Sequence, residues 1–189
     1  MKTLFQSSRF QAVLVSPNDE AELRETFEKF CYEHYVEKLG WEPKNEDGRE
    51  RDEYSSHSHY LMLFCDGNVV AGCRLIDGRT GSLPVGEKVK VLPNSGEISR
   101  YLKKKTAVLT DMRAGCIFYR VIYSAVKELG FSYIYADMRE KLFKALKMFS
   151  IVSFEQIGEK EAHNDAGPLV PVMLSFDIMK EAYERQMAL

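Results

Sequence analysis

Residues 96–101 read Gly96-Glu97-Ile98-Ser99-Arg100-Tyr101, which places a carboxylate and a guanidinium three residues apart with an apolar residue between them. This composition predicts a strand, and a strand sends successive side chains to opposite faces. One face then carries Glu97, Ser99 and Tyr101, and the opposite face carries Ile98 and Arg100. A Glu-x-x-Arg pair on a strand is commonly a solvated edge or a structural ion pair, so a catalytic role for Glu97 depends on the rest of the chain.

Charged residues elsewhere suit a cluster around this strand. Arg74 falls on another apolar strand, and Asp52 lies in an acidic loop just before a third. Buried charges must be paired, and Asp52, Arg74, Glu97 and Arg100 would pair among themselves. The alternative to chemistry, above all for the two arginines, is a purely structural ion-pair network.

Length and composition indicate an ordinary globular protein. The chain has 189 residues, of which 45% are hydrophobic and 29% are charged. We expect a single domain over residues 1–189. The formal net charge of -2 carries no signature of nucleic-acid binding. Residues 1–10 lack an apolar signal core, and no stretch is long enough to span a bilayer. We therefore expect a cytoplasmic protein.

The order of predicted elements mixes strands and helices. Strands are expected at residues 10–15, 60–65, 69–76, 96–102, 131–136, 151–157 and 169–176. Helices are expected at residues 19–39, in one piece or two, and at 110–129, 139–149 and 177–187. Polar loops are expected at residues 41–59 and 77–95. This order implies an α+β fold with a largely antiparallel sheet and some parallel pairing.

The histidines and cysteines of the chain favour neither a metal site nor a thiol nucleophile. His57-x-His59 has no further His or Cys at ligand spacing, so no metal site is predicted. Cys73 beside Arg74 sits among apolar strand neighbours, which favours core packing over a nucleophile. The four cysteines form no Cys-x-x-Cys pair and are typical of buried, reduced thiols in a cytosolic protein; they are Cys31, Cys65, Cys73 and Cys116.

Three short stretches resemble the acyl-homoserine-lactone synthases and the related N-acyl amino acid synthases, which share the GNAT acyltransferase fold. The first is Glu37-Lys38-Leu39-Gly40-Trp41 followed by Glu50-Arg51-Asp52-Glu53-Tyr54. The second is Val70-Ala71-Gly72-Cys73-Arg74-Leu75-Ile76, and the third is Gly96-Glu97-Ile98-Ser99-Arg100. Their order and spacing fit that family, and the predicted strand–helix order fits over the rest of the chain.

The resemblance implies a GNAT-like, mostly antiparallel sheet flanked by helices, and an amide-forming acyl transfer without a bound cofactor. The donor would be an acyl thioester on acyl carrier protein or CoA, and the acceptor the amine of a small metabolite. Glu97 would be the base, acting through water. The substrate-binding residues would be Trp41, Asp52, Arg74, Ser99 and Arg100. The acyl chain would enter between sheet and helix, among Ile117, Phe118, Val121, Phe143 and Met148.

Two departures from the family pattern bear on the acceptor. Cys31 stands where the family has a helical arginine, with Arg24 the nearest substitute, and Ser55 stands where a second carboxylate is expected. Losing a charge weakens binding of the S-adenosylmethionine sulfonium. A free amino acid acceptor, giving an N-acyl amino acid, is therefore preferred. The alternatives are an autoinducer synthase that uses S-adenosylmethionine, as in quorum sensing, and a non-catalytic acyl- or ligand-binding protein.

Two features concern the donor. The Arg/Gln-x-x-Gly-x-Gly/Ala turn that holds the CoA pyrophosphate in acetyltransferases is poorly matched by residues 111–116, which favours a carrier-protein thioester. Residues 100–147 carry 11 Lys and Arg against 4 Asp and Glu, and such a local excess steers acidic partners. The expected carrier-protein docking residues are Lys103, Lys104, Lys105, Lys144 and Lys147, with Lys141 beside them.

Overall fold

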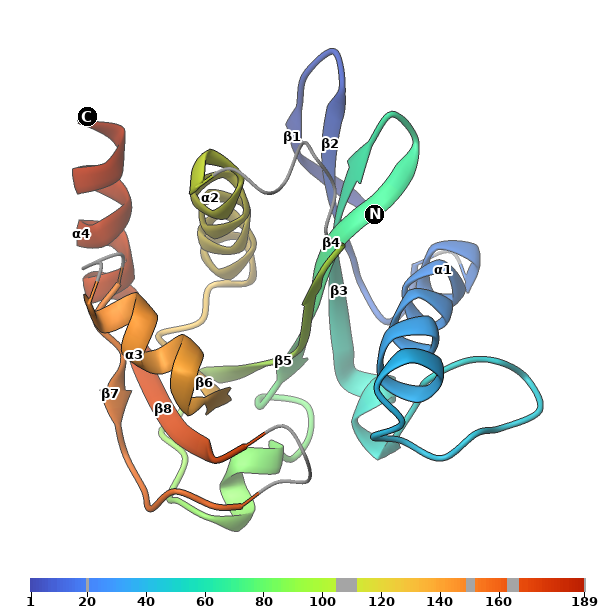
Figure 1. The fold of residues 1–189 in the computed structure, drawn as a ribbon. Coiled ribbons are helices and arrows are strands. Elements are labelled where there is room, and N and C mark those ends of the chain that lie inside the picture. The colour runs from blue at the N-terminus through green and yellow to red at the C-terminus, as the bar shows by residue number, and fades with distance from the viewer. Residues whose placement is uncertain (20, 105–111, 149–151, 163–166, 189) are drawn as a thin grey trace.

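One eight-stranded sheet runs through the whole computed structural model shown in Figure 1. Residues 1–19, 21–104, 112–148, 152–162 and 167–188 are described, with the backbone alone for 112–117. The strand order is β1-β2-β3-β4-β5-β6-β8-β7. The strands are β1 (Lys2–Gln6), β2 (Phe10–Val15), β3 (Ser58–Cys65), β4 (Asn68–Asp77), β5 (Ser95–Lys103), β6 (Tyr133–Arg139), β7 (Glu155–Gln156) and β8 (Leu169–Ser175).

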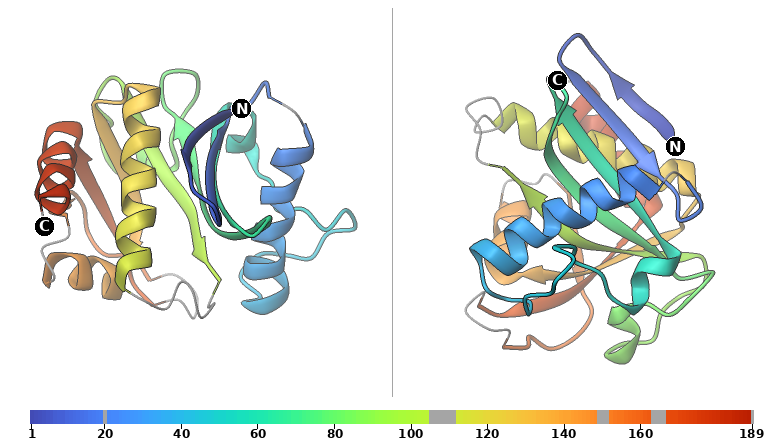
Figure 2. Two further views of the ribbon diagram at one scale, coloured as in Figure 1. Left: turned by 90° about the horizontal axis from the view of Figure 1, so that it is seen from above. Right: turned by 90° about the vertical axis from the view of Figure 1, so that its right-hand side faces the viewer.

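Helices cover both faces of this sheet. Helix α1 (Ala21–Tyr32), extended by a π-helical turn (Glu33–Lys38), lies alone on one face, which we call the α1 face. The opposite face, the α2 face, is covered by α2 (Met112–Leu129), α3 (Glu140–Met148) and α4 (Phe176–Met187) (Figures 1 and 2). Short 3-10 turns occur at Glu53–His57 and Pro84–Glu87.

Both faces of the central strands are buried, which explains their continuous apolar runs. On β3, Leu61 and Leu63 pack in the core cluster that contains Phe118 and Val121 of α2. The alternate residues Tyr60 and Met62 pack on the α1 face, with Phe27, Phe30 and Cys31. Cys31, Cys65 and Cys73 are free, buried thiols as predicted, whereas the side chain of Cys116 lies outside the described part.

Strands β5 and β6 form the only parallel pair among the described strands, and the pair is short. Ser95–Glu97 pair with Tyr133–Tyr135, and no pairing follows beyond Glu97. From there β5 continues beside β4 as far as Lys103, while β6 continues beside β8 as far as Arg139. The sheet therefore splays immediately after Glu97.

A β-bulge at Arg100 corrects the predicted alternation of faces. Arg100 and Tyr101 of β5 together lie opposite Cys73 of β4, and Arg100 has a positive φ of 50°. An extra residue in one strand shifts every later side chain to the other face. Arg100 therefore joins Ser99 on the α1 face, and Tyr101 packs against Phe118 on the α2 face at 5.4 Å between ring centroids.

The α+β fold and the mostly antiparallel sheet with one parallel pair are confirmed. The prediction missed β1, an edge strand with no buried residue. The strand expected at 151–157 reduces to Glu155–Gln156, with residue 151 outside the described part. The first two residues of the helix expected at 110–129 and the last residue of the helix expected at 139–149 also lie outside it. No helix in the described ranges combines the length and apolar character needed to cross a bilayer.

Candidate active site

Glu97 is the last residue of β5 before the strands separate. Its side chain is buried at 2% exposure, and Oε2 accepts a 2.9 Å hydrogen bond from the backbone N–H of Val85 in the 3-10 turn. Burial raises the pKa of Glu97 to about 7, and the nearby charge of Asp137 adds to the shift. The Val85 hydrogen bond and the charges of Arg74 and Lys88 act in the opposite direction. A carboxyl that titrates near neutrality suits a general base.

Arg74 fixes the loop before β3 to the centre of the sheet. Its Nη1 and Nη2 donate to the two carboxylate oxygens of Asp52 at 2.6 and 2.8 Å, and its Nε donates to Ser99 Oγ at 2.8 Å. Burial acts to raise the pKa of Asp52, but hydrogen bonds and charge from Arg74 outweigh it and hold that pKa below its usual value. The geometry explains why the loop carries Asp52, because the buried guanidinium of Arg74 requires a carboxylate partner.

Arg100 binds the same loop at a second point. Its Nε and Nη2 donate to Glu50 Oε1 at 2.8 and 2.5 Å, and Nη2 lies 3.2 Å from Glu42 Oε1 and 3.7 Å from Asp52 Oδ2. The guanidinium also lies over the ring of Tyr35, 5.5 Å from its centroid. Glu42 and Glu50 had no predicted role, although Glu50 stands in a quoted motif.

Trp41 follows the π-helical turn and faces the splay from the α1 side. Its ring lies 5.9 Å from that of Tyr35. The guanidinium of Arg139, at the end of β6, lies 4.1 Å from the Trp41 centroid. The Trp41–Arg139 contact therefore joins the segment after α1 to β6, where β5 and β6 have already separated.

The structure thus brings the predicted site residues together on the α1 face. The predicted ion cluster is confirmed for Asp52, Arg74 and Arg100. It is wrong for Glu97, whose hydrogen bond comes from a backbone N–H rather than an arginine. Ser99 holds Arg74 in place. Arg74 and Arg100, with their partners, thus form a hydrogen-bonded network that we call the paired wall; the partners are Asp52, Ser99, Glu50 and Glu42. Glu97, by contrast, is a buried carboxylate that has no ion pair among the described residues.

The residues expected around the acyl chain lie mostly on the α2 face. Phe118 and Val121 are buried in the main core cluster, and Ile98 of β5 contacts both that cluster and the one that includes Phe143. Met148 is 71% exposed, so it is not part of the buried core, and its place beside the entering acyl chain stays a prediction. The side chain of Ile117 lies outside the described part.

The expected docking lysines come from two elements. Lys103 ends β5 and Lys104 follows it, and Lys104 lies 3.8 Å from Glu33 and over the Phe30 ring at 5.0 Å. Lys144 pairs with Glu140 at 3.0 Å, while Lys141 and Lys147 are exposed on α3. Lys105 lies outside the described residues, and a docking role stays a prediction.

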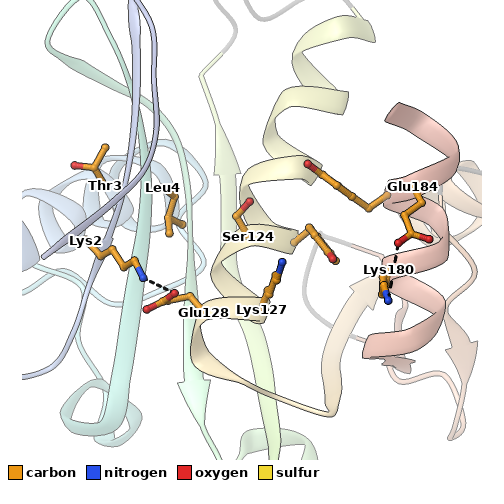
Figure 3. Close-up of a pocket in the computed structure, with 10 residues that line it drawn as sticks. Lys2, Thr3, Leu4, Ser124, Lys127, Glu128, Lys180 and Glu184 are labelled. Carbon is orange, nitrogen blue, oxygen red and sulfur yellow. Dashed lines mark ion pairs between the residues drawn. The ribbon is translucent and has the colours of Figure 1, made fainter. Parts of the chain in front are cut away.

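Two hollows on the described surface lie away from Glu97. One, of about 600 Å³, lies between β1, α2 and α4, where Lys2, Ser124 and Lys180 line it (Figure 3). The other, of about 340 Å³, lies beside α1 and includes Arg24 and Ser55. Arg24 therefore borders the loop containing Asp52, but neither hollow reaches the β5–β6 splay.

Histidine and thiol chemistry find little support in the geometry. His57 Nε2 lies 3.0 Å from the carbonyl oxygen of Ser82, and His59 Nε2 lies 3.9 Å from Asp77 Oδ2. Within the described ranges, no three His, Cys, Asp or Glu side chains form a group suited to a metal ion. Cys73 is fully buried, and burial raises its pKa well above its usual value. Cys73 thus packs in the core, as predicted.

Known proteins share this fold. No family model matches the chain. A curated acyl-homoserine-lactone synthase from Pseudomonas fluorescens is 40% identical over 60 residues, covering 29% of this chain. The match spans 31% of that relative's length. The crystal structure of the synthase LasI superposes with a TM-score of 0.77 at 15% identity, over 94% of this chain and 95% of LasI.

The chain has the acyl-homoserine-lactone synthase fold. FeeM, an N-acyl amino acid synthase from uncultured soil microbes, also matches, with a TM-score of 0.63 at 14% identity over 96% of this chain and 97% of FeeM. The resemblance indicated by the three motifs and the expected GNAT-like fold are both confirmed.

Proposed function

We propose that the protein is an N-acyltransferase that moves a fatty acyl group from a thioester to the amine of a small metabolite. The observation that carries this proposal is Glu97, a buried carboxyl with a pKa near 7 at the point where β5 and β6 separate. The likeness to acyl-homoserine-lactone synthases supports the same class of reaction.

The chemistry requires a base because an ammonium has no free electron pair. Glu97, through a water molecule, takes one proton from the acceptor ammonium. The amine nitrogen then attacks the thioester carbonyl carbon and forms a tetrahedral oxyanion. Backbone N–H groups on the edge of β5 beyond Glu97, where β6 no longer pairs, suit that oxyanion. Collapse breaks the C–S bond, the departing thiolate takes a second proton from the nitrogen, and Glu97 returns its proton to solvent.

For the donor, an acyl group on acyl carrier protein is favoured over acyl-CoA. A carrier-bound phosphopantetheine has no adenosine pyrophosphate, and residues 111–116 match the CoA pyrophosphate turn poorly. The lysines at the end of β5 and along α3 supply positive charge for an acidic carrier. The reaction needs no resident cofactor, and we place the enzyme in the cytoplasm.

For the acceptor, the site favours a free amino acid, with an N-acyl amino acid as product. Ser55 Oγ accepts from Asp52 N–H at 3.1 Å and donates to Asp52 Oδ1 at 3.3 Å. Ser55 thus caps the 3-10 turn and adds no negative charge, and Asp52 is already bound by Arg74. A sulfonium would find less negative charge here than two free carboxylates provide.

A second candidate is an autoinducer synthase that acylates S-adenosylmethionine. The segment that is 40% identical to the Pseudomonas fluorescens synthase favours it. The deciding experiment incubates the enzyme with acyl carrier protein thioesters, acyl-CoA, pooled amino acids and S-adenosylmethionine, and identifies products by mass. N-acyl amino acids as the main products support the proposal. A dominant lactone with inert amino acids overturns the acceptor assignment, and unreacted thioester in every mixture supports a non-catalytic binding protein.

A further inference from the structure

Strand β6 carries two opposite charges in the part that continues after its pairing with β5 has ended. Asp137 and Arg139 are two residues apart, so they share one face with roughly 7 Å between their Cα atoms. That face is the α1 face, because the charge of Asp137 acts on Glu97 and the guanidinium of Arg139 lies on Trp41. Neither residue was singled out from the sequence.

Asp137 is only partly satisfied by the protein. Its Oδ2 accepts from Lys88 Nζ at 2.7 Å, and Lys88 Nζ also lies 2.8 Å from Glu161. Its Oδ1 is buried and has no hydrogen-bond partner among the described residues, although the side chain as a whole is 19% exposed. A buried carboxylate oxygen without a donor is costly. The position is therefore suited to an N–H donor from a ligand.

Arg139 differs from the other arginines of the site. Arg74 and Arg100 are held by carboxylates, whereas Arg139 makes no ion pair in the described part of the chain and rests on the Trp41 ring at 4.1 Å. A guanidinium stacked on an aromatic ring keeps its in-plane N–H groups available. Those groups match a carboxylate in a bidentate arrangement.

We propose that Asp137 and Arg139 bind the α-amino acid part of the acceptor as a zwitterion. Asp137 receives the ammonium, which sets the nitrogen beside Glu97, and Arg139 receives the carboxylate, with Trp41 holding its guanidinium in place. The inference rests on the proposed acyl transfer to an α-amine. It holds for a free amino acid and for the amino acid portion of S-adenosylmethionine alike.

The test compares each amino acid with the amine that lacks its carboxylate, for example leucine with isoamylamine, in the full-length enzyme. Arg139→Gln is expected to raise KM for the amino acid about 10- to 100-fold, the usual size of a lost charged hydrogen bond, and to leave KM for the amine unchanged. Asp137→Asn is expected to raise KM for both acceptors. Arg139→Lys should restore part of the loss, and Arg9→Gln, at an exposed arginine paired with Asp66, is the matched control.

Equal effects of Arg139→Gln on the two acceptors, or none on either, would overturn the inference. KM for the acyl thioester should stay constant in all variants, and a large change there would also count against it. If the wild-type enzyme acylates no acceptor, the proposed function fails. Calorimetric binding of the amino acid and the amine to the same variants then still decides whether the two residues bind the zwitterion.

Discussion

Two groups of charges meet at the centre of the sheet, and they differ in how completely the protein pairs them. Arg74 and Arg100 direct their N–H groups to Asp52, Glu50, Glu42 and Ser99. Glu97 and the exposed Arg139 make no ion pair within the described residues, and Asp137, which pairs with Lys88 through Oδ2, leaves its buried Oδ1 without a hydrogen-bond partner there. A network in which every charged group has a partner is a structural feature of the fold. Buried polar groups without partners lower the free energy of unfolding unless a bound substrate pairs with them. The difference supports our proposal that the acyl transfer takes place on the β6 side of the splay.

Removing the carboxylate of Glu97 should have the largest effect on turnover. We expect Glu97→Gln to lower kcat about 10²- to 10⁴-fold, the usual contribution of a general base. The amide side chain of this variant retains an oxygen to accept the Val85 N–H, so folding should persist. Steady-state assays of amide formation measure the loss, and near-normal kcat in a folded variant would remove Glu97 from the mechanism.

The same substitution should stabilise the protein at alkaline pH. The pKa of Glu97 is about 7 in the fold against 4.5 as the ordinary value, so the native state binds the extra proton between those pH values. Its stability therefore falls as pH rises from about 4.5 and is lowest above 7. Glu97→Gln removes this penalty, and urea unfolding at pH 8 should show a gain of about 3 kcal/mol. An unchanged or lower free energy of unfolding would contradict the burial of an ionised Glu97.

Replacing an arginine of the paired wall should affect the stability of the fold rather than turnover. We expect Arg74→Ala or Arg100→Ala to lower the free energy of unfolding by about 3–5 kcal/mol, because each leaves a partly buried carboxylate without its partner. Arg9→Ala, which breaks an exposed pair with Asp66, should leave the free energy of unfolding almost unchanged, because exposed ion pairs contribute little. Thermal and urea unfolding compare the three, and wild-type stability in both wall variants would show that these arginines are not structural.

The smallest expected effect concerns donor docking. Reversing Lys103, Lys104 and Lys105 to Glu should raise KM for a carrier-bound thioester a few-fold, since steering charges act mainly on association. The effect should shrink with added salt. A small soluble thioester supplies the control, because its KM should not change. Equal effects on both donors would argue against a docking surface.

The sequence predicted what local patterns encode. Apolar alternation located most strands. Because a buried arginine needs an acidic partner, the sequence also linked Arg74 with Asp52. It assigned Arg100 to the wrong face of the sheet, because a bulge inserts one residue without disturbing the apolar pattern. It missed the Trp41–Arg139 contact because two segments far apart in sequence meet only once β5 and β6 have separated. Asp137 gave no signal, since an acid on an apolar strand does not reveal whether both of its oxygens are paired.

The pH dependence of amide formation tests the central claim most directly. In the wild-type enzyme, kcat/KM for the acceptor should fall as pH drops below about 7, because protonated Glu97 cannot accept the ammonium proton. The Glu97→Gln variant should be slow throughout and show no inflection near that pH. A wild-type profile without a titration near 7, or the same inflection in Glu97→Gln, would contradict the assignment of Glu97 as the base.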